Sequence, residues 1–276
     1  MAERKTVGPD DARSWLLVNG SRTDLFDGAL ASHADQVVLD IEDAVDPAHK
    51  DEARAGVIEW LGSHRAWVRI NDRSTSFWED DVAKLAGAPG LLGVMLAKTE
   101  AAEHVTETFD RLGGSLKVLA LVESALGIEE AVHIAKARGA FRLAFGSGDY
   151  RRDTGTSADE LAMAYPRSRL VLASRIGGLP GPIDGPTVGG THALLREQAA
   201  DAVNLGMTGK LCLDLEQPAV INEAMSPSPA DVAWANSFME EFEAAGGVIR
   251  DGSDKPRLAR AQTIQRRAEV FRITVS

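Results

Sequence analysis

Short apolar runs alternate with longer amphipathic runs along most of this 276-residue sequence. The short runs have the length and composition of β-strands, and the intervals between them have the spacing of helices. This alternation predicts βαβ units and therefore a parallel sheet. The expected strands cover residues 15–18, 37–39, 67–70, 92–96, 118–122, 143–145, 182–183 and 210–212.

Helical patterns fill most of the intervals between these strands. Eight strand–helix units within about 225 residues favour a closed (β/α)8 barrel, a TIM barrel, over an open doubly wound sheet, which stays the alternative. We therefore expect residues 1–225 to form the barrel. The expected barrel helices cover residues 23–32, 52–61, 78–86, 101–112, 128–137, 167–176 and 193–205.

The pattern changes in residues 226–276, which we predict to be a C-terminal helical extension or lid. A Ser-Pro-Ser-Pro segment begins a helix over residues 230–245, and Gly246-Gly247 ends it. A polar loop at 250–256 precedes a second helix over 257–271. Because this segment is too short for an independent core, it is expected to pack on the barrel or to reach a neighbouring subunit.

Charge and composition exclude several classes of protein. A formal net charge of −11 without a long basic run argues against a nucleic-acid partner. No apolar stretch has the length of a membrane span, and the N-terminus has no signal-peptide core, so no membrane partner is expected. The single cysteine, Cys212, lies in an apolar run and is interpreted as a core residue of a cytoplasmic protein.

Polar residues follow each expected strand. In a barrel these positions converge at the carboxyl ends of the strands, where active sites lie. The residues are Arg22, Asp40, Glu42, Asp43, Arg69, Lys98, Glu123, Asp149, Asp184 and Asp214.

Glu123 and Asp149 are the candidate metal ligands. Glu123 ends a strongly apolar run, where a carboxylate must be paired or solvated by a site. Two carboxylates from adjacent strand ends can hold one Mg²⁺ and leave positions for water and substrate oxygens. The alternative is that both carboxylates form salt bridges with Arg22, Arg69 or Lys98.

The basic residues have several interpretations. Arg22 and Arg69 could bind a carboxylate or stabilise an oxyanion, or could form structural ion pairs. Lys98 could form a Schiff base, but the nearby carboxylates would keep it charged, which disfavours that chemistry. The acidic run from Asp40 to Asp43 could bind a second metal, although orienting neighbouring Arg and Lys residues is the preferred interpretation.

The chain resembles the citrate lyase β-subunit-like proteins, which belong with malyl-CoA and citramalyl-CoA lyases in the HpcH/HpaI-type aldolases. The resemblance covers most of the chain, and its most specific parts are the 38–45 segment and the Glu123/Asp149 pair. The matching motifs are Asn19-Gly-Ser-Arg22, Val38-Leu-Asp-Ile-Glu-Asp-Ala-Val45, Val68-Arg-Ile-Asn71, Met95-Leu-Ala-Lys98, Leu121-Val-Glu123, Phe145-Gly-Ser-Gly-Asp149, Ile183-Asp-Gly-Pro186 and Asp254-Lys-Pro256.

The resemblance implies a metal-dependent carbon–carbon lyase, usually trimeric and here a homo-oligomer (trimer or hexamer). Its Mg²⁺ would be held by Glu123 and Asp149, and its small-molecule partners would be a 2-oxo acid and a CoA thioester. Arg69 and Arg22 would act on the substrate's oxygens, with Glu42, Asp43 and Lys98 also at the substrate site. Asp254 would close over a neighbouring subunit's site as acid or base.

The sequence also departs from this family. Many relatives have Cys-Ile-His-Pro where this chain has Cys212-Leu-Asp-Leu215, and the segment before Asp254 is shorter. The first change falls at the expected rim of the pocket, where a thioester would bind. Two alternatives therefore stay open: a class II aldolase that acts on free 2-oxo acid adducts without CoA, and a non-catalytic paralogue.

Overall fold

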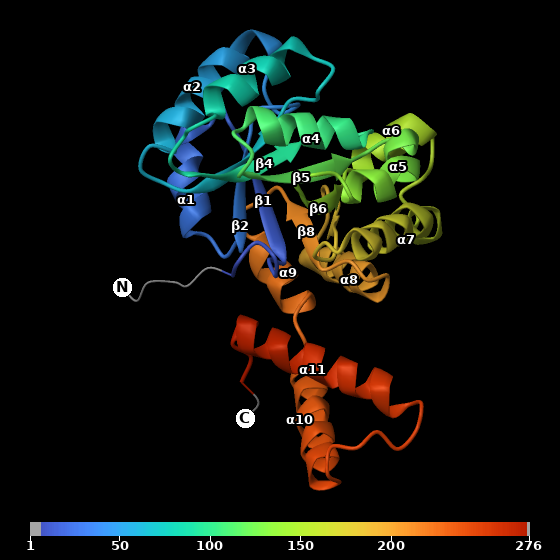
Figure 1. The fold of residues 1–276 in the computed structure, drawn as a ribbon. Helices are drawn as coiled ribbons and strands as arrows, with labels where there is room; N and C mark the ends of the chain where they lie inside the picture. Colours follow the sequence, from blue (N-terminus) through green and yellow to red (C-terminus); the bar gives the residue numbers. More distant parts are fainter. Residues whose placement is uncertain (1–6, 275–276) are drawn as a thin grey trace. The chain divides into compact units, whose positions relative to one another are not determined.

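The chain forms a closed barrel of eight parallel strands. The computed structural model describes residues 7–274. Each strand pairs with the next in chain order, and β8 closes the barrel on β1 (Figure 1). This confirms the predicted (β/α)8 barrel, and the open-sheet alternative is wrong. The strands are β1 Ser14–Asn19, β2 Gln36–Asp40, β3 Ala66–Ile70, β4 Leu91–Leu96, β5 Lys117–Val122, β6 Ala140–Phe145, β7 Ile183–Asp184 and β8 Gly209–Cys212.

Helices connect successive strands on the outside of the barrel (Figure 1). Side-chain caps begin several of them: Thr75 accepts a hydrogen bond from the Trp78 N–H, and Ser124 accepts one from Gly127. Such caps satisfy first-turn N–H groups that have no partner within the helix. The helices are α1 Phe26–Ala31, α2 Lys50–Trp60, α3 Ser76–Leu85, α4 Ala102–Arg111, α5 Ala125–Ala135, α6 Ser147–Thr154, α7 Glu160–Gly177, α8 His192–Asn204 and α9 Gln217–Ala224, with 3-10 turns η1 Thr23–Leu25 and η2 Pro47–His49.

Aromatic side chains fill part of the barrel's core. Trp15 and Trp67 meet edge to face at 5.3 Å, and Trp67 stacks on Phe141 at 5.6 Å. The fully buried Arg142 donates hydrogen bonds to the carbonyl oxygens of Ala12 and Gly181. These contacts fill part of the barrel's interior with packed side chains. The carboxyl ends of the strands are then available for a functional site.

Several helix boundaries differ from the sequence prediction. Helices α6 and α9 were not expected, and α7 begins at Glu160, well before the predicted start at 167. Asp159 caps α7 by accepting a hydrogen bond from Leu161, and Pro166 lies buried inside the helix. The predicted helix covered only the residues after this proline, whereas burial of the proline's face stabilises a helix that continues through it.

The chain divides into two compact units, Gly8–Ala224 and a unit formed around the segment from Met225 onward. The latter contains helices α10 Pro229–Ala244 and α11 Asp254–Phe271. Ser228 and Asp231 form a capping box at the start of α10, and Phe238 and Ala261 belong to the core between the helices. Asp254 is the first residue of α11, so its predicted place in a polar loop before the helix is wrong.

Candidate active site

Glu123 follows β5 and is a buried carboxyl group at the carboxyl end of the barrel. Its side chain is 4% exposed, and its Oε1 accepts a hydrogen bond of 2.8 Å from the backbone N–H of Lys98. Burial raises the pKa of Glu123 to about 8, with Asp149 and Glu42 adding to the effect, while the Lys98 N–H and Arg69 oppose it. A carboxyl group whose pKa lies this close to neutrality is poised to exchange its proton for a cation.

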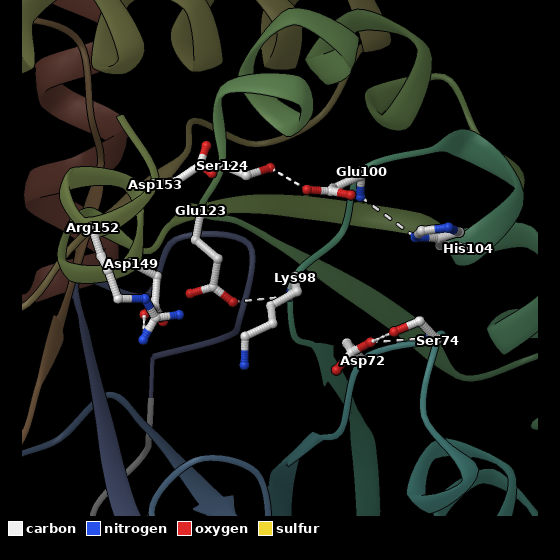
Figure 2. Close-up of a pocket in the computed structure, with 10 residues that line it drawn as sticks. All are labelled: Asp72, Ser74, Lys98, Glu100, His104, Glu123, Ser124, Asp149, Arg152 and Asp153. Atoms are coloured by element: carbon white, nitrogen blue, oxygen red, sulfur yellow. Dashed lines mark hydrogen bonds and ion pairs between the residues drawn. The ribbon is translucent and has the colours of Figure 1, made fainter. Parts of the chain in front are cut away.

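Asp149 reaches the same place from the first turn of α6. Its carboxylate forms a 2.8 Å ion pair with the exposed Arg152. Figure 2 shows the carboxylates of Glu123 and Asp149 on the same side of the pocket. The two side chains come from adjacent strand ends, β5 and β6, as the sequence predicts.

Gly146 makes room for Glu123. A Cβ atom at Gly146 would lie 2.2 Å from Oε2 of Glu123 and 2.4 Å from its Cβ, which is closer than real atoms approach. Glycine at this position therefore lets β6 pass close beside the carboxyl group. From the sequence, this glycine could be identified only as part of a turn, because its role depends on a contact between two strands.

Arg69 lies at the end of β3 and is held by two carboxylates. Its Nε and Nη2 donate to Asp40 at 2.8 and 2.5 Å, and its Nη1 lies 3.3 Å from Glu42. Burial lowers the pKa of Arg69, but Asp40 and then Glu42 and Glu123 outweigh it and raise the pKa above its usual value. The result is a fixed positive charge close to Glu123.

Lys98 is held by the acidic run after β2. Its ammonium group donates to Glu42 and, at 3.0 Å, to Asp43. Burial opposes the charge, but these two carboxylates raise the pKa of Lys98 above its usual value. A lysine that stays protonated cannot form a Schiff base, so the geometry disfavours that alternative.

A pocket of about 530 Å³ lies over Glu123, Asp149 and Lys98 (Figure 2). Its other lining residues were not identified from the sequence, because they lie in the loops and helices that follow the strands and carry no motif of their own. Among the hydrogen bonds there, Glu100 accepts one from Ser124, and His104 accepts one from the Glu100 N–H. These additional lining residues are Asp72, Ser74, Glu100, His104, Ser124, Arg152 and Asp153.

The structure does not bring every predicted residue into this pocket. Arg22 is exposed and pairs with Asp24 through hydrogen bonds of 2.9 and 2.8 Å. Asp254 belongs to the C-terminal unit, where its carboxylate accepts hydrogen bonds from the backbone and side chain of Arg250 at 2.9 and 3.3 Å. Arg22 does not line the pocket.

Asp184 and Cys212 are buried within the fold and have structural roles. Asp184 is fully buried and accepts hydrogen bonds from Arg167 and Lys210, so this strand-end carboxylate is neutralised within the fold. The sequence pattern assigned no role to either cation. Cys212 is also fully buried, and burial raises the pKa of its thiol. Such a thiol is an inert core residue, as expected.

The site's donors fit a hard divalent cation completed by water and substrate. Within residues 7–274, no three His, Cys, Asp or Glu side chains are placed to hold a metal by themselves. Two carboxylates are, however, what Mg²⁺ uses when the remaining ligands are water and substrate oxygens. A TIM barrel with two such carboxylates and a fixed arginine at its strand ends defines an enzyme class that stabilises negative charge developing on substrate oxygen.

Comparison with known proteins agrees with this class. The HpcH/HpaI aldolase/citrate lyase family pattern matches residues 13–214, and the HpcH/HpaI aldolase C-terminal domain pattern matches residues 230–272. The chain belongs to the HpcH/HpaI aldolase/citrate lyase family. This confirms the resemblance predicted from the motifs, and with it the prediction of an enzyme of the carbon–carbon lyase type.

Individual relatives are similar over nearly their whole length. The chain is 31% identical to a citrate lyase subunit beta-like protein of Deinococcus radiodurans, covering 91% of this chain and 95% of that one. It is 30% identical to an L-malyl-CoA/beta-methylmalyl-CoA lyase of Cereibacter sphaeroides, covering 94% and 95%. Protein CitE of Mycobacterium tuberculosis, solved with magnesium, acetoacetate and coenzyme A, superposes with a TM-score of 0.80 at 30% identity, covering 94% of this chain and 99% of that one.

The helices also bear on membrane insertion. In the part of the chain that the structure describes, no helix combines the length and apolar character needed to cross a bilayer.

Proposed function

We propose that this chain is a Mg²⁺-dependent lyase that cleaves or forms a 3-hydroxyacyl-CoA such as malyl-CoA or citramalyl-CoA. The observation that carries the proposal is the buried Glu123 beside Asp149, with Arg69 fixed next to it by Asp40 and Glu42. The malyl-CoA lyase relatives and the CitE complex with magnesium and coenzyme A support this choice. The products of cleavage would be a 2-oxo acid and an acyl-CoA.

The proposed reaction needs stabilisation of negative charge and a proton carrier. Deprotonation of the substrate hydroxyl allows the carbon–carbon bond to break, which leaves a carbonyl group and a thioester enolate that takes a proton on carbon. Mg²⁺ held by Glu123 and Asp149 would supply Lewis-acid stabilisation of substrate oxygen. Arg69 adds a fixed positive charge, and Arg22, whose exposed pair with Asp24 contributes little to stability, is proposed to bind the carboxylate of the substrate.

The proton carrier is proposed to be Asp254 of a neighbouring copy in a homo-oligomer. Hydrogen bonds from the Arg250 backbone, and then from its side chain, hold the pKa of Asp254 below its usual value. The carboxylate is therefore ionised at neutral pH and suited to accept the hydroxyl proton in the cleavage direction.

The direct test is incubation with Mg²⁺ and a panel of 3-hydroxyacyl-CoA thioesters, followed by measurement of 2-oxo acid release. Release from one or more thioesters is expected. If a protein that keeps its circular dichroism spectrum released none, the CoA version of the proposal would be wrong.

A class II aldolase acting without CoA is the second candidate. It is favoured by the segment after β8, where Leu213 and Leu215 are 45% and 46% exposed on either side of Asp214. This is the place where many relatives have His-Pro. Exchange of pyruvate methyl protons in D₂O, with Mg²⁺ and no thioester, would support this candidate, whereas strict dependence on CoA would exclude it.

Substitution of Gly146 by alanine should displace Glu123 and weaken Mg²⁺ binding. The added Cβ would overlap the Glu123 carboxylate, so we expect about 100-fold lower affinity and a loss of about 1–3 kcal/mol in the free energy of unfolding. Gly148→Ala is the matched control, since a Cβ there meets nothing within 4 Å. Calorimetric titration with Mg²⁺ and thermal unfolding measure both effects, and equal affinities for the two variants would contradict this role of Gly146.

Mg²⁺ affinity should depend on pH through Glu123. Because burial raises its pKa to about 8, Mg²⁺ must displace a proton below that pH, and the apparent affinity should fall by about tenfold per unit of decreasing pH. Above pH 8 the affinity should level off. Calorimetry in buffers of different ionisation enthalpy should detect about one proton released at pH 7. An affinity that is constant between pH 6 and pH 8 would show that Glu123 is already ionised without metal.

A further inference from the structure

The backbone of Lys98 has a conformation that residues with side chains rarely adopt. Its φ is +47°, in the left-handed region, and Arg272 is the only other non-glycine residue with positive φ among residues 7–274. Arg272 lies at the end of a helix, where this conformation is common. Lys98 instead lies two residues after the end of β4, at the pocket, so its conformation must be imposed by the surrounding structure.

The main chain of Lys98 acts on Glu123. Its N–H donates the 2.8 Å hydrogen bond to Oε1. No described residue donates a hydrogen bond to Oε2, which is the oxygen beside Gly146. One oxygen is thus fixed by Lys98, and the other is left for a ligand from outside the chain.

The side chain of Lys98 binds the acidic residues that follow β2, not Glu123. Its ammonium group binds Glu42 and Asp43, and Glu42, which is 2% exposed, lies 3.3 Å from Nη1 of Arg69. Without Lys98, Arg69 would be the only ion-pair partner of the buried Glu42 carboxylate among the described residues, since the nearby Lys50 ammonium donates to the backbone oxygen of Glu42. A buried carboxylate that loses a partner pulls more strongly on the remaining one and lowers the positive potential of the site.

We propose that Lys98 is a positioning residue with two separable actions. Its backbone N–H holds Glu123 in place for the divalent cation, and its ammonium group, acting through Glu42, keeps Arg69 available for an anionic 2-oxo acid. The inference rests on the proposed function for the identity of these two ligands. It differs from a direct contact between Lys98 and the substrate, because the side chain acts through a carboxylate.

Four variants separate the two actions. Lys98→Met removes the charge and keeps the chain length, Lys98→Arg keeps the charge, and Lys98→Gly removes the side chain while permitting positive φ. Lys98→Val disfavours positive φ because it is β-branched. Calorimetry measures the Kd of Mg²⁺ for each variant and the Kd of pyruvate at saturating Mg²⁺.

The expected results differ between the side-chain and the backbone variants. Lys98→Met and Lys98→Gly should keep Mg²⁺ affinity and weaken pyruvate binding by about tenfold, and Lys98→Arg should retain most of the pyruvate affinity. Lys98→Val should also weaken Mg²⁺ binding by about tenfold relative to Lys98→Met. If Lys98→Val does not fold, an α-hydroxy analogue of lysine at position 98, which replaces the N–H by oxygen, tests the same hydrogen bond. Equal Mg²⁺ affinities for Lys98→Met and the backbone-altered protein would overturn the main-chain action.

A double variant tests whether the side chain acts through Glu42. In Lys98→Met/Glu42→Gln, the charge left unpaired by the first change is removed by the second, so pyruvate affinity should recover most of its loss. No recovery would mean that Lys98 contacts the oxo acid directly and would overturn this half of the proposal. If the unmodified protein bound Mg²⁺ but no pyruvate, the proposed function and the side-chain action would both fail, while the Mg²⁺ affinities would still decide the main-chain action.

Discussion

Replacing Glu123 by glutamine is expected to weaken Mg²⁺ binding by at least about 100-fold and to lower kcat/KM for thioester cleavage by about 10³-fold or more. The amide keeps the size of the side chain and can still accept the Lys98 hydrogen bond. It removes only the negative charge that the cation requires. Titration calorimetry with Mg²⁺ and steady-state kinetics measure the two losses.

Although Glu123→Gln should weaken Mg²⁺ binding, it should increase the stability of the metal-free protein at alkaline pH. Burial raises the pKa of Glu123 from an ordinary value of 4.5 to about 8, so the folded state binds the proton more tightly than the unfolded state does. Its contribution to stability is complete below pH 4.5 and is lost as pH rises through 8. Without metal, the Glu123→Gln protein should therefore be more stable than the unmodified protein at pH 8 to 9, and added Mg²⁺ should stabilise only the latter.

Glu100→Gln provides the matched control for Glu123→Gln. Glu100 is also a glutamate that lines the same pocket, but it is bound by Ser124 and lies in the loop after β4. The Glu100→Gln protein should bind Mg²⁺ with an affinity within a few-fold of that of the unmodified protein. If Glu100→Gln lost as much affinity as Glu123→Gln, the loss would reflect the pocket's overall charge, and the assignment of Glu123 as a metal ligand would be wrong.

The barrel could be predicted because most of its strands, unlike the short β7 and β8, are continuous apolar runs that need no tertiary information to recognise. Helices α6 and α7 differ from the sequence prediction, and each difference has an identifiable cause. Helix α6 begins immediately after β6 with Ser147-Gly148, which has the composition of a turn. Helix α7 contains Pro166, and the favourable burial of that face is not visible in the sequence.

The candidate site was predictable where a residue stands at a strand end. Arg69, Lys98, Glu123 and Asp149 are brought together as their positions indicated. The room beside Gly146 and the left-handed backbone of Lys98 depend on contacts between strands, so no local pattern encodes them. Asp184 had the same strand-end position as the others, but Arg167 and Lys210, from other elements, neutralise it.

Asp254→Asn is expected to keep Mg²⁺ affinity and to lose catalytic rate by about 10²- to 10⁴-fold. The asparagine can still accept the hydrogen bond from the Arg250 N–H, so the start of α11 should be retained. Asp251→Asn is the control, because Asp251 lies in the same turn and is bonded to Ser253. Full activity of Asp254→Asn, or an equal loss in Asp251→Asn, would remove Asp254 from the reaction.

Complementation between two inactive variants tests whether Asp254 serves a neighbouring subunit. In an oligomer mixed from Asp254→Asn and Glu123→Gln chains, some sites would combine an intact Glu123 from one chain with an intact Asp254 from another. Activity should therefore return on co-refolding or co-expression, up to the share of such sites that random mixing produces. If Asp254 acted on its own barrel, every site would contain one substitution and the mixture would stay inactive. Size-exclusion chromatography with light scattering establishes that mixed oligomers formed, so an inactive mixed oligomer would contradict the shared site itself.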